Sequence, residues 1–113
     1  MKDLFVSYDQ AEAIEALGFN EPCIATIDQT HYIHIKGTKT LPRGAMVYNI
    51  TSLPTKQQAI LFLLNKCDEI HGGELSVEIF GDGSGTIKNY GRSFNSLSQA
   101  IDKLIGFANG KLL

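Results

Sequence analysis

Residues 53–70, LPTKQQAILFLLNKCDEI, decide how the chain folds. Pro54 stops a helix from extending backwards, and Thr55 with Gln58 forms a capping box that satisfies backbone N–H groups at a helix start. Six apolar residues then follow without a break, from Ala59 to Leu64, whereas an ordinary surface helix carries a single apolar stripe. We therefore expect a central helix that is covered on more than one side.

Two interpretations of this apolar run stay open. The run belongs to a buried core helix, or part of it is exposed and used in self-association. In the second case the self-association residues are Ile60, Leu61, Phe62 and Leu64. The run is far shorter than the roughly 20 apolar residues that span a bilayer, so we expect no membrane contact.

Length and composition are those of one small globular domain, residues 1–113, that can bury its own core. The chain carries 43% hydrophobic and 19% charged residues, which is ordinary for this class. The first residues lack the pattern of a secretory signal peptide, so we expect a cytoplasmic protein. The two cysteines, Cys23 and Cys67, do not make a disulfide framework, and both are expected to be buried thiols.

Charge is distributed unevenly along the chain, although the net charge is only −2. Residues 1–28 carry six acids and one base, residues 29–67 carry five bases and no acid, and residues 68–113 carry six acids and four bases. Two interpretations fit this pattern. The acidic first helix packs beside the basic middle and neutralises it, or the basic middle binds phosphate, nucleic acid or an acidic partner.

The remaining elements follow from local signals. Ser7 with Gln10 and Ser96 with Gln99 form two more capping boxes, and Gly18 is placed to end the first helix. Hairpins in place of alternating strands and helices indicate an α+β fold: a mainly antiparallel sheet of four to five strands with helices packed on one face, in the order α-β-β-(β)-α-β-β-α. The expected strands are residues 23–27, 31–35, 45–50, 75–80 and 86–90.

Three anchor points carry a resemblance to a family. Residues 16–23, ALGFNEPC, follow an early Gln10-Ala11 pair; residues 54–59 read PTKQQA; and the last helix has Ala100 before Leu104-Ile105. In these segments the chain resembles small uncharacterised proteins encoded in phages and integrated elements of gut Bacteroidetes. The resemblance covers most of the chain and implies no known activity.

A candidate binding surface combines aromatic and basic residues. Tyr32 and His34 are expected to share one face of a strand, and a basic loop with Lys36, Lys39 and Arg43 follows directly. Aromatic and basic side chains together are typical of surfaces that bind single-stranded nucleic acid, and equally of any exposed sheet face. The segment 31–43 therefore defines an alternative function: a weak nucleic-acid or phosphate binder.

Signals for chemistry are absent from the sequence. His31 and His34 are three residues apart, which on a strand places them on opposite faces, so we expect no metal site. Residues 81–85 are glycine-rich, but a strand and not a helix follows them, as in a plain hairpin and unlike a phosphate-binding loop. We expect no cofactor and no enzymatic activity. The leading hypothesis is a non-enzymatic interaction protein whose partner is another protein or a second copy, a homodimer.

Overall fold

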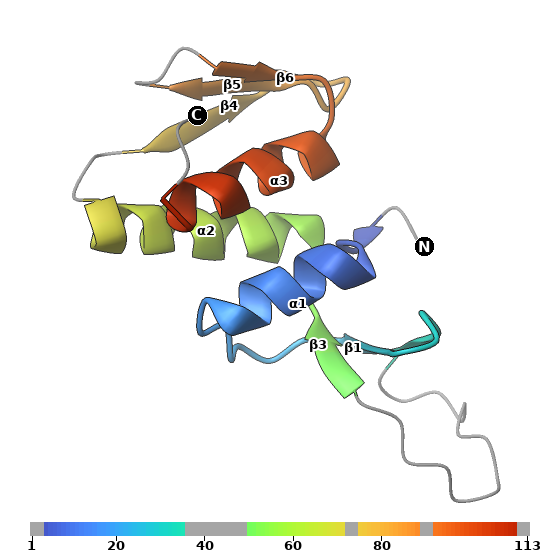
Figure 1. The fold of residues 1–113 in the computed structure, drawn as a ribbon. Helices are drawn as coiled ribbons and strands as arrows, with labels where there is room; N and C mark the ends of the chain where they lie inside the picture. The colour runs from blue at the N-terminus through green and yellow to red at the C-terminus, as the bar shows by residue number, and fades with distance from the viewer. Residues whose placement is uncertain (1–3, 36–49, 72–74, 89–91, 111–113) are drawn as a thin grey trace, which may run out of the picture. The chain divides into compact units, whose positions relative to one another are not determined.

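The computed structural model describes residues 4–35, 50–71, 75–88 and 92–110. The chain forms two compact units, Met1–Thr55 and Lys56–Leu113 (Figure 1). The protein is α+β, and each unit contains its own three-stranded antiparallel sheet. In the part of the chain that the structure describes, no helix is both long and apolar enough to cross a membrane.

The expectation of a single sheet of four to five strands is wrong. The strands that precede the central helix form one sheet, and the strands that follow it form another. Each strand pairs with near neighbours in sequence, and a helix of 16 residues, about 24 Å long at 1.5 Å per residue, separates the two groups. The alternation of apolar residues predicted antiparallel hairpins, but it carries no information on whether distant hairpins share a sheet.

The first unit consists of one helix and the first sheet. Helix α1 spans Tyr8–Ala16, and strands β1 (Ala25–Asp28), β2 (Ile33–Ile35) and β3 (Ile50–Leu53) form the sheet with β1 in the centre. Pairing is antiparallel on both sides of β1, and a further bridge joins Phe5 to Thr55. Strand β3 was expected at residues 45–50; residues 45–49 lie outside the described residues. The buried apolar residues are Phe5, Val6, Ala11, Ile14, Phe19, Ala25, Ile27 and Leu53.

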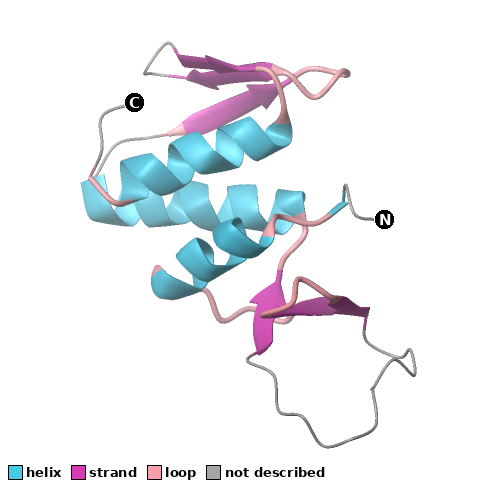
Figure 2. Ribbon diagram, turned by 45° about the vertical axis from the view of Figure 1, so that its right-hand side comes forward, coloured by secondary structure: helices cyan, strands magenta, loops and turns pink. Residues whose placement is uncertain are grey.

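The second unit contains two helices and the second sheet. Helix α2 spans Lys56–His71 and helix α3 spans Leu97–Ala108. Strands β4 (Ser76–Ile79), β5 (Gly85–Lys88) and β6 (Arg92–Phe94) are antiparallel, with β5 in the centre. Strand β6 was not expected from the sequence. In Figures 1 and 2, α2 and α3 lie on the same side of this sheet.

Helices α2 and α3 pack against each other, and polar contacts join them near their C-terminal ends. His71 Nε2 donates to the Phe107 carbonyl oxygen at 2.7 Å, and the two rings lie 4.5 Å apart. The Cys67 thiol donates to the Leu104 carbonyl oxygen at 3.7 Å. The buried apolar residues of the unit are Ala59, Ile60, Leu63, Cys67, Leu75, Ile87, Phe94, Ala100, Ile101, Leu104, Phe107 and Ala108.

The ends of α1 and α3 follow from local capping. Ser7 Oγ accepts from the Gln10 N–H at 3.2 Å and Gln10 Oε1 accepts from the Ser7 N–H at 2.9 Å, so the first capping box is confirmed. At α3, Ser96 Oγ accepts from the Gln99 N–H at 3.2 Å. Gln99 Oε1 accepts from the Asn95 N–H at 2.6 Å, one residue earlier than in a capping box.

Candidate functional site

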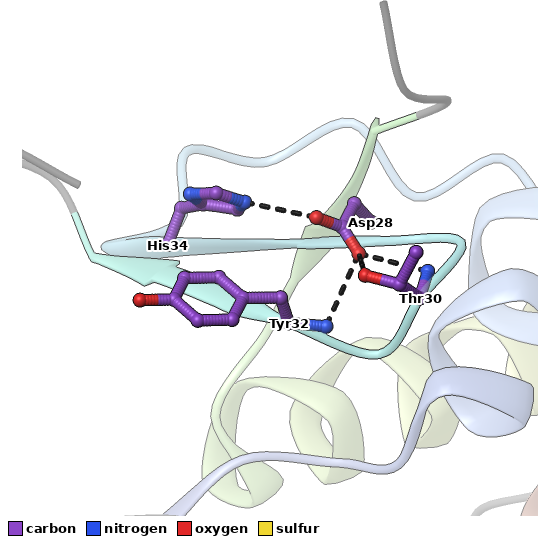
Figure 3. A network of polar contacts seen from close by, with 4 residues as sticks. All are labelled: Asp28, Thr30, Tyr32 and His34. Carbon is purple, nitrogen blue, oxygen red and sulfur yellow. Dashed lines mark hydrogen bonds and ion pairs between the residues drawn. The ribbon is translucent and has the colours of Figure 1, made fainter. Parts of the chain in front are cut away.

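The β1–β2 hairpin is organised by the carboxylate of Asp28, the last residue of β1 (Figure 3). Asp28 Oδ1 accepts from the backbone N–H of Thr30 at 2.8 Å, from the backbone N–H of Tyr32 at 3.1 Å and from the Thr30 hydroxyl. Asp28 Oδ2 lies 3.1 Å from His34 Nε2. The residue is only 3% exposed, so its carboxylate is satisfied almost entirely by this loop.

These contacts hold the pKa of the Asp28 carboxyl well below its usual range. The hydrogen bond from the Thr30 hydroxyl is the largest cause; burial opposes it, and the contacts with His34 and with the backbone N–H groups of Tyr32 and Thr30 add to the lowering. Each of these donors favours the charged form of the carboxylate. Asp28 is therefore a structural anion that fixes the hairpin loop.

The loop contains a residue with a strained backbone conformation, His31. His31 has a φ of 67°, in the left-handed region that favours glycine. Its backbone N–H donates to the Asp28 carbonyl oxygen at 2.9 Å, and its ring stacks on Tyr8 with centroids 4.5 Å apart. His31 was expected to begin the strand 31–35, but β2 begins at Ile33. The Asp-x-Thr spacing, in which an aspartate bonds the backbone two residues on, is the sequence signal for this network.

We expect Asp28→Ala to lower the stability of the first unit more than Asp28→Asn, because asparagine keeps an acceptor oxygen but loses the charge. The pH dependence follows from linkage. The folded pKa is depressed, so this contribution is fully present above the unfolded pKa of about 4 and is lost as pH falls towards the folded value. The urea midpoint should therefore fall more steeply below about pH 4 in the wild type than in Asp28→Asn. An equal fall in both proteins would contradict this assignment.

The candidate nucleic-acid surface is only partly described by the structure. Tyr32 is 54% exposed, and its ring lies 4.8 Å from that of His34, so the expectation that they share a face is confirmed. His34 is half-buried against Asp28. Lys36, Lys39 and Arg43 lie outside the described residues. Binding of nucleic acid or phosphate through the segment 31–43 therefore stays a prediction.

A second candidate site lies in the second unit, between α2, β4 and the start of α3. It is a mostly apolar groove of about 350 Å³. The groove is open to solvent at two of its apolar side chains, because Leu61 is 59% exposed and Ile79 is 46% exposed. The side chains that line it are Gln57, Ile60, Leu61, Leu64, Val77, Ile79 and Leu97.

The four self-association candidates take different places on α2. Ile60, Leu61 and Leu64 line the groove, whereas Phe62 is half-buried and does not line it. Ile60 is buried, Leu64 is half-buried, and Leu61 is the exposed member of the set. Val77 and Ile79 of β4, which the sequence did not single out, form the opposite wall of the groove.

Possible metal ligands and cysteine thiols are the remaining groups with reactive chemistry among the described residues. The part of the chain with coordinates contains no group of three or more His, Cys, Asp or Glu side chains that could hold a metal ion. Cys67 is a free, buried thiol whose pKa is raised to about 11, first by burial and then by the nearby Asp68 carboxylate. Such a thiol stays protonated near neutral pH and is a poor nucleophile. Cys23 is half-buried and forms no disulfide, and its thiol donates to the Glu21 carbonyl oxygen at 3.5 Å.

Comparison with protein-family models, with curated proteins and with solved structures found no match to this chain. The resemblance to small proteins of phages and integrated elements therefore stays a prediction.

Proposed function

We propose that this protein is a non-enzymatic interaction protein that forms a homodimer through the apolar groove of its second unit. The observation that carries the proposal is the exposure of Leu61 and Ile79 on the two walls of one groove. Single exposed apolar side chains are common, but exposed apolar side chains gathered around a concave apolar site mark a place of association. Complete burial of one such side chain contributes about 1.5–3 kcal/mol.

The choice of a second copy as the partner is supported by the charge on β4, the strand that forms one wall of the groove. In a two-fold dimer the same patch meets itself, so a net charge on the patch would repel its own copy. On β4, Glu78 is paired with Lys88 of β5, with Nζ and Oε2 3.5 Å apart. A wall strand whose charge is compensated within one chain suits a copy of itself better than a strongly charged partner.

The test is sedimentation velocity from low to high micromolar concentration. Wild-type protein is expected to shift from monomer to dimer, and Leu61→Asp to stay monomeric. The aspartate removes an apolar contact in both copies and brings a charge into the interface, so the dissociation constant of the dimer should rise by about 100-fold or more.

Ile24→Asp is the matched control. Ile24 is about as exposed as Leu61, but it belongs to the first unit and is not among the residues that line the groove. This variant should dimerise like the wild type. A wild-type protein that remains monomeric at high micromolar concentration, or an Ile24→Asp variant that loses dimerisation as Leu61→Asp does, would overturn the proposal.

A further inference from the structure

The strand that forms one wall of the groove is also an edge of its sheet. Among the described residues β4 pairs with β5 and with no other strand, so its second edge faces away from the sheet. An edge strand presents backbone N–H and C=O groups that can pair with another strand. The same element thus offers an apolar groove and a set of main-chain hydrogen-bonding groups.

The hydrogen-bond pattern shows which β4 residues present these groups. The Phe80 N–H donates to the Ser84 carbonyl oxygen at 2.7 Å, so Phe80 points its main-chain groups towards β5. In an antiparallel pair, alternate residues point to opposite sides. Glu78 therefore bonds β5, and Val77 and Ile79 direct their N–H and C=O groups to the open edge.

The other end of this edge is already occupied. Leu75 precedes Val77 by two residues and Ile79 by four, so its main-chain groups point to the same side of the strand as theirs. The Leu75 N–H donates to Asp68 Oδ1 of α2 at 3.0 Å. This bond is consistent with main-chain N–H groups of Val77 and Ile79 that point away from β5. It also limits the open edge of β4 to Val77 and Ile79, the two residues whose side chains line the groove.

We propose that the partner in the homodimer is bound by antiparallel pairing of β4 with β4 of the second copy, which joins two three-stranded sheets into one of six strands. This inference rests on the proposed function, because it names how the second copy meets the groove. Val77 of each copy then pairs with Ile79 of the other copy. Each of these two pairs exchanges two main-chain hydrogen bonds, which gives four bonds about a two-fold axis at Glu78. The exposed Leu61 side chains of both copies then lie beneath the new seam.

The axis brings the two Glu78 side chains opposite each other. Like charges in this position destabilise a strand pair. In each copy, however, Lys88 of β5 lies within 3.5 Å of the Glu78 carboxylate and compensates its charge. One face of the joined sheet therefore carries the Glu78–Lys88 ion pair of each copy, and the other face carries the apolar side chains of the groove.

Amide hydrogen exchange tests the pairing on the unmodified protein. At concentrations where the wild type is dimeric, the amides of Val77 and Ile79 should exchange at least about tenfold more slowly than in monomeric Leu61→Asp. The Phe80 amide, which bonds within the chain, is the internal control and should be protected in both.

A cysteine placed at the two-fold axis gives a second test. In this register the Glu78 Cα atoms are about 4.5 Å apart, within the range that a disulfide bridges. In a Cys23→Ser background, Glu78→Cys should form a covalent dimer on mild oxidation, as seen on a non-reducing gel. Ser76→Cys should not, because its equivalents lie about 13 Å apart, four residues along the strand at about 3.3 Å each.

The outcomes separate the two proposals. A wild type that dimerises without protection of the Val77 and Ile79 amides and without a Glu78→Cys cross-link overturns the strand pairing and leaves the homodimer in place. A wild type that stays monomeric overturns both. Equal cross-linking of Glu78→Cys and Ser76→Cys would also contradict the proposed register.

Discussion

Gly85→Ala is expected to destabilise the second unit by about 3 kcal/mol or more, at or above the upper end of the usual cost of overpacking. A Cβ atom at this position would lie 1.9 Å from the Glu78 carbonyl oxygen and 2.8 Å from Phe94 Cζ. The carbonyl belongs to the β4–β5 pair and Phe94 is buried, so neither can move without opening the sheet. Urea unfolding followed by circular dichroism measures the loss.

Gly81→Ala is the control for this substitution. Gly81 lies in the hairpin loop between the same two strands, and an added Cβ there meets nothing within 4 Å. We expect its effect to stay within about 0.5 kcal/mol, as for most surface substitutions. Similar urea midpoints for Gly85→Ala and Gly81→Ala would contradict the close approach of β4 and β5 at Gly85.

Leu63→Ala is expected to cost about 2–5 kcal/mol, because Leu63 is 0% exposed and its truncation leaves a cavity in the core. The matched comparison is Leu61→Ala, two residues earlier on the same helix. Leu61 is exposed, so at a protein concentration low enough to keep the chain monomeric its loss should change stability by less than about 0.5 kcal/mol. Equal losses for both variants would mean that Leu61 belongs to the core and that the groove surface has been misassigned.

Helix ends were the part of the fold that the sequence predicted best. The capping side chains of Ser7 and Ser96 act on backbone groups three residues away, so their effect is visible in a short window. The same holds for Gly18, which follows α1 with a φ of 99°. These helix ends depend on residues that are close in sequence, so a short window of sequence is enough to predict them.

The number of sheets could not be predicted in this way. Alternating apolar residues indicate which face of a strand is buried, but not which distant strand lies beside it. Strand β6 is only three residues long, Arg92–Phe94, and too short to show an alternation of its own. Gly85 appeared to belong to a loop, because the close approach of Phe94 that requires glycine depends on this unpredicted strand.

Only one wall of the groove lies in a segment that the sequence singled out. The unbroken run from Ala59 to Leu64 marked α2 as a candidate surface, but an unbroken run has no periodicity that separates its exposed member from its buried ones. The exposure of Leu61 and its position beside Ile79 depend on where β4 lies against α2, which only the fold supplies.

The most direct test of the homodimer is an isotope-filtered nuclear Overhauser experiment on a mixture of 13C-labelled and unlabelled protein. Only contacts between different copies give a signal in this measurement. We expect intermolecular signals from the methyl groups of Leu61, Leu64, Val77 and Ile79, which line the groove, and none from the exposed Ile24 of the first unit. Intermolecular signals confined to the first unit, or their complete absence at high micromolar concentration, would contradict association through the groove.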